Sequence, residues 1–229
     1  LYPDIGQSVV RVLNRAGIQV EVPPNQTCCG QPAFNAGMRS QARQMAIHTI
    51  EVFEATQGTI IIPSGSCCSM IRHSYPELFS NDPIWLPRAK ALAERCFELS
   101  EFLVDVLGIT DLGSRLPSKI TYHSSCHLLR ELGVNRQPRL LLSSIHDAEI
   151  VELPGSDECC GFGGVFSVEY PEISAAMLER KIENIKSTGA DLIVSCDAGC
   201  ITNINGGLQR KNLSQRVVHI AEVLDSFDK

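Results

Sequence analysis

Four cysteines in the second half of the chain have the type and placement needed to bind a metal. Cys126, the adjacent pair Cys159 and Cys160, and Cys200 each follow a segment with the composition of a buried strand. If these strands form a parallel sheet, their carboxyl ends share the edge at which open α/β sheets place ligands. The sequence therefore predicts that four thiols distant in the chain lie together.

Four thiolates are the set that either a [4Fe–4S] cluster or a zinc ion takes from a protein. Structural zinc sites typically draw two ligands from each of two C-x2-4-C turns, whereas the spacing here is single, adjacent pair, single. Two adjacent residues seldom both reach one small tetrahedral ion without strain. A cluster is larger and its metal corners lie further apart, so the spacing favours a [4Fe–4S] cluster in this half.

Three glycines directly after the second pair support the same interpretation. Gly161, Gly163 and Gly164 leave little side-chain bulk, so backbone N–H groups can approach a bulky anionic cofactor. Hydrogen bonds from such groups to cluster sulfurs help to set the reduction potential. We therefore predict that these glycines contact the cofactor.

The first half repeats this arrangement. The string TCCGQPAFNAG at 27–37 parallels ECCGFGGVF at 158–166, and each copy is followed by a helical segment and a further cysteine. Self-similarity of this kind indicates a duplicated supersecondary unit.

The first copy supplies Cys28, Cys29 and Cys67, one thiol fewer than the second copy. The single cysteine of the second copy stands 33 positions before its pair. The same spacing in the first copy falls before Leu1, so we expect an additional strand and its cysteine there. The first site is then expected to hold a second cluster, a zinc ion or no metal.

Other candidate side chains lie near these cysteines. His123 and His127 stand on either side of the single cysteine of the second copy and suit zinc ligation, proton transfer or helix capping, of which we favour capping. Cys68 and Cys196 are expected not to bind, because adjacent residues on an extended chain point in opposite directions. Cys96 has no partner pattern and is interpreted as a core thiol.

Each copy alternates strand and helix, which specifies a parallel sheet with right-handed crossovers. We predict an α/β fold of two lobes related by a pseudo-twofold axis, each a small parallel sheet flanked by helices. The expected division is a first repeat over 1–95, a connector of helices and turns over 96–118, in which Ser100 caps a helix, and a second repeat over 119–229. The expected strands are 17–23, 59–63, 119–126, 148–154 and 190–195, and the main helices are 5–16, 40–56, 128–145 and 171–187.

Composition excludes several classes of protein. The 229 residues carry a formal charge of −6 with no block rich in lysine and arginine, so there is no footprint for nucleic acid or an anionic membrane. No apolar run approaches the roughly 20 residues of a membrane-spanning helix. Ten cysteines would suit a disulfide framework, but amphipathic helices and repeated adjacent pairs favour metal or cluster binding in the cytoplasm.

Five strings together resemble the cysteine-rich CCG domain family, which occurs in tandem copies in heterodisulfide reductase and in the iron–sulfur subunit of glycolate oxidase. They are QTCCGQPAFNAG, PSGSC at 63–67, YHSSCH, ECCGFGGVFS, and GC followed by ITNINGG at 199–207. The length and the lack of a ferredoxin-like segment resemble the lactate utilization branch. This resemblance implies an iron–sulfur electron-transfer subunit of a cytoplasmic complex that oxidises L-lactate to pyruvate, with other iron–sulfur subunits as partners and no complete enzyme in this chain alone.

Two alternatives stay open beside that expectation. One is a thiol or heterodisulfide reductase whose cluster is the catalytic centre, and the other is a zinc-binding structural subunit. The heterodisulfide reductase pattern ends in C-x-x-C, whereas Ser64 and Asp197 stand at the first of those two positions here. A five-cysteine cluster is therefore not expected.

Overall fold

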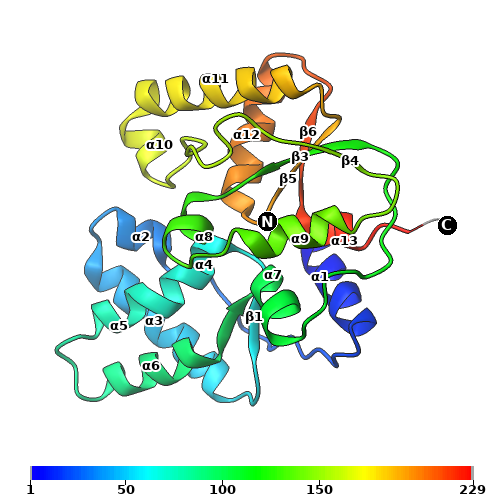
Figure 1. Ribbon diagram of the computed structural model, residues 1–229. Coiled ribbons are helices and arrows are strands. Elements are labelled where there is room, and N and C mark those ends of the chain that lie inside the picture. Colours follow the sequence, from blue (N-terminus) through cyan, green and yellow to red (C-terminus); the bar gives the residue numbers. More distant parts are fainter. Residues whose placement is uncertain (1, 228–229) are drawn as a thin grey trace.

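Two parallel β-sheets organise the chain in the computed structural model, which describes residues 2–227 (Figure 1). The smaller sheet pairs β1 (Ile60–Ile62) with β2 (Cys96–Glu98). The larger has the order β4-β3-β5-β6, and all its pairs are parallel. Its strands are β3 (Lys119–His123), β4 (Glu149–Val151), β5 (Leu192–Ser195) and β6 (Arg216–His219). The predicted α/β class, with two small parallel sheets flanked by helices, is confirmed.

Helices cover both faces of the larger sheet. On one side lie α11 (Pro171–Thr188) and α12 (Ala198–Arg210), and on the other lie α9 (Arg136–Ser143) and α13 (Ile220–Leu224) (Figure 1). The central strands β3 and β5 are buried beyond their first residues, as expected for parallel strands covered on both faces. Their carboxyl ends therefore form a fixed edge.

The smaller sheet is surrounded by helices of 4 to 16 residues. In chain order these are α2 (Gln31–Asn35), α3 (Arg39–Glu54), α4 (Gly65–Ser69), the π-helix η1 (Met70–Ser74), α5 (Tyr75–Leu78) and α6 (Trp85–Arg95). Buried Tyr75 and Phe79 fill the space between them. The Tyr75 hydroxyl donates a hydrogen bond of 2.8 Å to the carbonyl of Cys29, which holds the first cysteine pair against this core.

The two halves of the chain share a hydrophobic core. Helix α1 (Pro3–Arg15) packs against α13 near the other end of the chain, while α9 packs against α7 (Leu99–Glu101) and the π-helix η2 (Phe102–Val106). Buried side chains from all these helices belong to one cluster. The residue boundaries between repeats stay a prediction.

The predicted strand at 17–23 is wrong. Its residues form no β-ladder, and Val22 is 67% exposed. A cavity of about 760 Å³, lined by this segment and by residues of β1, separates the two. An extended segment becomes a β-strand only when a neighbouring strand pairs with its backbone N–H and C=O groups. Within residues 2–227, no strand pairs with the segment 17–23.

The connector predicted to contain only helices and turns includes β2, which pairs in register with β1, Ile61 opposite Phe97. The predicted cap at Ser100 is also wrong. Glu98 is the N-cap of α7, and its side chain accepts hydrogen bonds from the backbone N–H groups of Ser100 and Glu101. A three-residue strand that runs directly into a helix leaves too short a pattern to recognise.

The single helix predicted over 128–145 is two helices, α8 (Cys126–Arg130) and α9. The chain breaks at Gly133, whose φ of +69° is open to glycine at little cost. Pro138 then lies in the first turn of α9, where no N–H is needed. The remaining helix is α10 (Phe166–Glu169).

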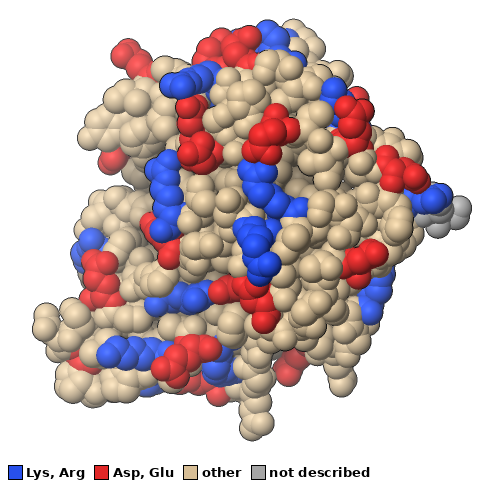
Figure 2. Space-filling view, viewed as in Figure 1, with Lys and Arg blue, Asp and Glu red and all other residues tan. Residues whose placement is uncertain are grey.

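Acidic and basic side chains are interspersed on the face shown in Figure 2. Across residues 2–227, every helix is too short or too polar to cross a membrane.

Candidate metal centre

The four cysteines of the second repeat come together at the carboxyl edge of the larger sheet. Cys126 is the first residue of α8, directly after β3, and Cys200 lies in the first turn of α12, after β5. The Sγ atoms of Cys160 and Cys200 are 3.5 Å apart. Cys159 interacts with both Cys126 and Cys160, so the thiols form one continuous group. The predicted convergence is therefore observed, and the role of these thiols as ligands stays a prediction.

The four thiols of this group shift one another's pKa values. The pKa of Cys159 is lowered because the thiols of Cys126 and Cys160 donate hydrogen bonds to its sulfur, which the N–H of Gly161 also approaches to 3.3 Å. The same interaction raises the pKa of Cys126 and Cys160. Each additional thiolate in this group is disfavoured by the negative charge of its neighbours. A bound metal would supply positive charge to several thiolates at once, so the group fits a metal centre.

The three cysteines of the first repeat also lie together. The Sγ atoms of Cys29 and Cys67 are 3.3 Å apart. The pKa of Cys28 falls to about 6 because Cys29 donates a hydrogen bond to its sulfur. Cys29 is buried whereas Cys28 is exposed, so this group reaches the surface at one end.

Both cysteine groups open into one cavity of about 480 Å³ between the two sheets. Its lining includes all seven of these cysteines, together with Phe162, Gly163 and Gly164 of the second repeat and Gln31 and Ser64 of the first. A molecule that fills this cavity would therefore contact both repeats.

A carboxylate joins the loops that carry the last cysteine of each repeat. Asp197 Oδ2 accepts hydrogen bonds from Ser64 Oγ at 3.1 Å and from the Ser66 N–H at 2.9 Å. The N–H of Gly65 donates to the carbonyl of Cys196 at 3.2 Å. Ser64 and Asp197 stand at the positions that lack the additional cysteine, and here they link the repeats to each other.

Comparison with known proteins agrees with the repeated cysteine pattern. Residues 1–72 and 120–205 match the family described as the cysteine-rich domain, CCG.

The chain belongs to the CCG family. It is 45% identical over 226 residues to lactate utilization protein A of an Exiguobacterium species, which covers 98% of this chain and 92% of that protein. It is also 45% identical over 223 residues to lactate utilization protein A 2 of Bacillus cereus, covering 97% of this chain and 92% of the relative. The resemblance expected from the sequence strings is confirmed.

In this CCG protein, the glycines after the second pair have distinct positions. Gly161 has a φ of +86°, and a Cβ there would lie 2.6 Å from the carbonyl oxygen of Ser174, so only glycine lets the loop pack on α11. Gly163 and Gly164 also have positive φ and line the cavity. Their predicted contact with a cofactor stays a prediction.

The histidines beside Cys126 differ from each other. His123, predicted as a helix cap, is the last residue of β3, is fully buried, and has no hydrogen-bond partner at either ring nitrogen. The capping interpretation is therefore wrong for His123. Burial lowers its pKa to about 3. His127 lies on α8, where its Nδ1 is 2.9 Å from Glu131.

Lys181 is a site residue that the sequence analysis missed. It lies on α11 with 1% of its surface exposed, and its ammonium group donates to the carbonyl of Gly155. Its charge interacts with those of Cys160 and Cys200. The available signal was its place three residues after Leu178 on the buried stripe of this helix, where a lysine is uncommon unless it has a partner.

Three further cysteines of the CCG protein lie outside the cavity. Cys68 and Cys96 are buried in the first half of the chain. Cys196 packs in the core near Tyr122, whose hydroxyl is 3.8 Å from the sulfur. This placement agrees with the expectation that none of the three binds a metal, which stays a prediction.

At Gly65 the two CCG repeats lie in close contact. A Cβ at Gly65 would lie 2.6 Å from Cβ of Leu128, where α4 packs on α8. We expect Gly65→Ala to lower the free energy of unfolding by roughly 1–3 kcal/mol, measured by urea denaturation, because the repeats must separate. Gly6→Ala is the matched control, since its Cβ would meet nothing within 4 Å in α1. Equal stability of the two variants would contradict this close contact.

Proposed function

We propose that this CCG protein is an iron–sulfur electron-transfer subunit of a complex that oxidises L-lactate to pyruvate. The main support for the proposal is that four thiols from separate strand ends converge: Cys126, Cys159, Cys160 and Cys200. These residues would hold a [4Fe–4S] cluster. The names of the relatives, lactate utilization protein A, support lactate as the electron source.

The surrounding residues suit an electron carrier. A bound [4Fe–4S] cluster takes up and releases single electrons at a potential that its protein environment sets. The N–H of Gly161 donates to the sulfur of Cys159, and the buried ammonium of Lys181 offsets negative charge on Cys160 and Cys200. Both interactions favour the more negative, reduced state and therefore raise the potential.

The remaining parts of the proposal concern the first repeat and the partners. Cys28, Cys29 and Cys67 would hold a second cluster or a zinc ion. Other iron–sulfur subunits of the lactate-oxidising complex would exchange electrons with the chain in the cytoplasm.

Metal analysis tests the iron–sulfur assignment. After anaerobic reconstitution with iron and sulfide, we expect about four iron and four acid-labile sulfide per occupied site, with an EPR signal on reduction. Protein that stays free of iron would contradict the proposal. Zinc binding in place of iron, with unfolding on chelation, would instead establish the structural zinc alternative.

A separate measurement tests the link to lactate. In the complex assembled with its partner subunits, L-lactate should reduce the cluster of this chain, whereas the isolated chain should not respond. Reduction of the isolated chain by L-lactate would show that this subunit itself oxidises the substrate.

The shared cavity favours one second candidate, a thiol or heterodisulfide reductase. Its volume of about 480 Å³ and its lining by cysteines of both repeats would admit a small organic disulfide beside the metal centre. That function predicts a change in the EPR signal when a thiol or disulfide substrate is added to the loaded protein. An unchanged signal would leave electron transfer as the assignment.

A further inference from the structure

His123 is a buried polar side chain that the four-thiol site does not explain. Its ring has no exposed surface, and neither nitrogen makes a hydrogen bond of ordinary geometry, the backbone of Ser156 being the one hydrogen-bonding group in the described chain that acts on its pKa. Buried polar groups almost always have a partner, and leaving one unpaired costs about 1–3 kcal/mol. A partner for this ring is therefore expected among groups that occupy the site when it is loaded.

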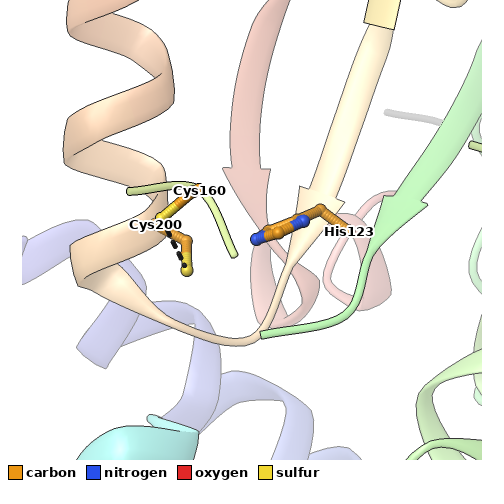
Figure 3. Close-up of side chains that lie close together, drawn as sticks. All are labelled: His123, Cys160 and Cys200. Carbon is orange, nitrogen blue, oxygen red and sulfur yellow. Dashed lines mark hydrogen bonds between the residues drawn. The ribbon is translucent and has the colours of Figure 1, made fainter. Parts of the chain in front are cut away.

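The ring lies beside two of the proposed ligands. The ligand atoms of His123, Cys160 and Cys200 are all within 4.8 Å of one another, and all three residues are buried. In Figure 3 one edge of the ring points towards the two sulfurs, which come from the loop after β4 and from α12. Two donor atoms at about 2.0–2.3 Å from one tetrahedral metal lie roughly 3.3–3.8 Å apart, and donors on neighbouring metal atoms of a cluster lie further apart, so side chains within 4.8 Å of one another can reach the same metal centre.

The fold fixes the ring in this position. His123 is the last residue of β3 and pairs with Ser195 of β5, so its side chain projects at the sheet edge where the thiols converge. The buried strand permits little movement of the backbone. The arrangement is thus built into the sheet rather than into a surface loop.

We propose that His123 is a nitrogen ligand of the second-repeat metal centre, beside Cys160 and Cys200. This inference rests on the proposed function and gives the centre a neutral imidazole in place of one of its four thiolates. Replacing thiolate by histidine ligands removes negative charge and raises the reduction potential, as it does in Rieske centres. A potential above that of an all-cysteine centre follows.

Pulsed EPR on the reconstituted, reduced protein tests the ligand directly. Protein labelled with ¹⁵N-histidine should show strong hyperfine coupling to one histidine nitrogen. The coupling should be absent from His123→Gln, whose reduction potential should fall, and unchanged in His146→Gln. His146 is the matched control because it is a histidine of the same repeat that is exposed and lies beside Asp111.

A second variant distinguishes the loss of a metal ligand from the loss of the folded structure. His123→Cys should keep the full iron content and lose the nitrogen coupling, because it restores a ligand of another type. Strong coupling that persists in His123→Gln, or only weak coupling in the wild-type protein with full iron content, would overturn the proposal.

An experiment with Co²⁺ distinguishes failure of this proposal from failure of the proposed iron–sulfur function. If reconstitution loads no iron, the proposed function fails, and Co²⁺ alone then serves as the probe. His123→Gln should change the Co²⁺ absorption spectrum and weaken Co²⁺ binding at least tenfold. An unchanged spectrum and affinity would overturn the assignment of His123.

Discussion

Replacing Cys160 with serine is expected to abolish iron binding at the second-repeat site. Cys160 contacts both Cys159 and Cys200, so it is the thiol through which the group is continuous. A serine hydroxyl stays protonated at neutral pH and is a poor ligand for iron. The iron and sulfide contents after anaerobic reconstitution should fall by about four each per chain, and the EPR signal of this centre should disappear. Cys200→Ser should give the same result.

The controls for this prediction are cysteines outside the cavity. Cys96→Ser should keep the full iron content, because Cys96 is buried in the first half of the chain, in β2. Cys196→Ala should keep it as well, although Cys196 is only four residues from Cys200, since its sulfur faces Tyr122 in the core. Equal loss of iron from every variant would mean that the ligand assignment is wrong.

Replacing Glu98 with glutamine is expected to stabilise the protein at pH 8 and to have a much smaller effect at pH 5. The Glu98 carboxyl is fully buried, and its Oε1 atom has no hydrogen-bond partner. Burial and, to a smaller extent, the negative charge of Glu101 raise its pKa from 4.5 to about 7, against the opposing effect of hydrogen bonds from Ser100 and Glu101. Cys68 and Cys196 also face this carboxyl.

The direction of the pH dependence follows from the raised pKa. Folding favours the protonated carboxyl, so its contribution to stability is fully present below pH 4.5 and is lost as the pH rises through about 7. Above pH 7 the buried charge costs on the order of 3 kcal/mol, since one pKa unit corresponds to about 1.4 kcal/mol. Glu98→Gln removes that cost and keeps a side-chain oxygen that accepts hydrogen bonds at the N-cap of α7.

Urea denaturation at pH 5 and pH 8 measures this effect. The free energy of unfolding of Glu98→Gln should exceed that of the wild-type protein by about 3 kcal/mol at pH 8 and by under about 1 kcal/mol at pH 5. Glu183→Gln on α11 is the control, because Glu183 is exposed and pairs only with Lys186. Equal increases in the free energy of unfolding at both pH values would show that folding does not favour the protonated form of Glu98.

The strand ends and the cysteines that follow them could be predicted from the sequence. A buried parallel strand such as β5 has a strong apolar pattern, and topology brings its carboxyl end to a known edge. The segment 17–23 has a similar pattern but no partner strand in residues 2–227. Strand pairing depends on residues far away in the chain, which a local pattern does not contain.

The thiols of the candidate site could be predicted from the sequence, but its other polar groups could not. The cysteine pairs recur in both repeats with nearly constant spacing to the cysteine that follows. His123, Lys181 and Asp197 belong to no such repeated pattern. Their importance comes from burial and from contacts with other elements: Asp197 bonds to Ser64 and Ser66 of the first repeat. Such contacts are set by how the repeats pack, so they became visible only in three dimensions.

The cavity that the two repeats share also bears on how the protein should react with air. All seven thiols line the same space, which communicates with solvent near Cys28. Oxygen or peroxide that enters this cavity comes next to sulfur atoms of both repeats. Inactivation on exposure to oxidants should therefore strike the two halves of the molecule in a single event, so that partly damaged molecules are scarce.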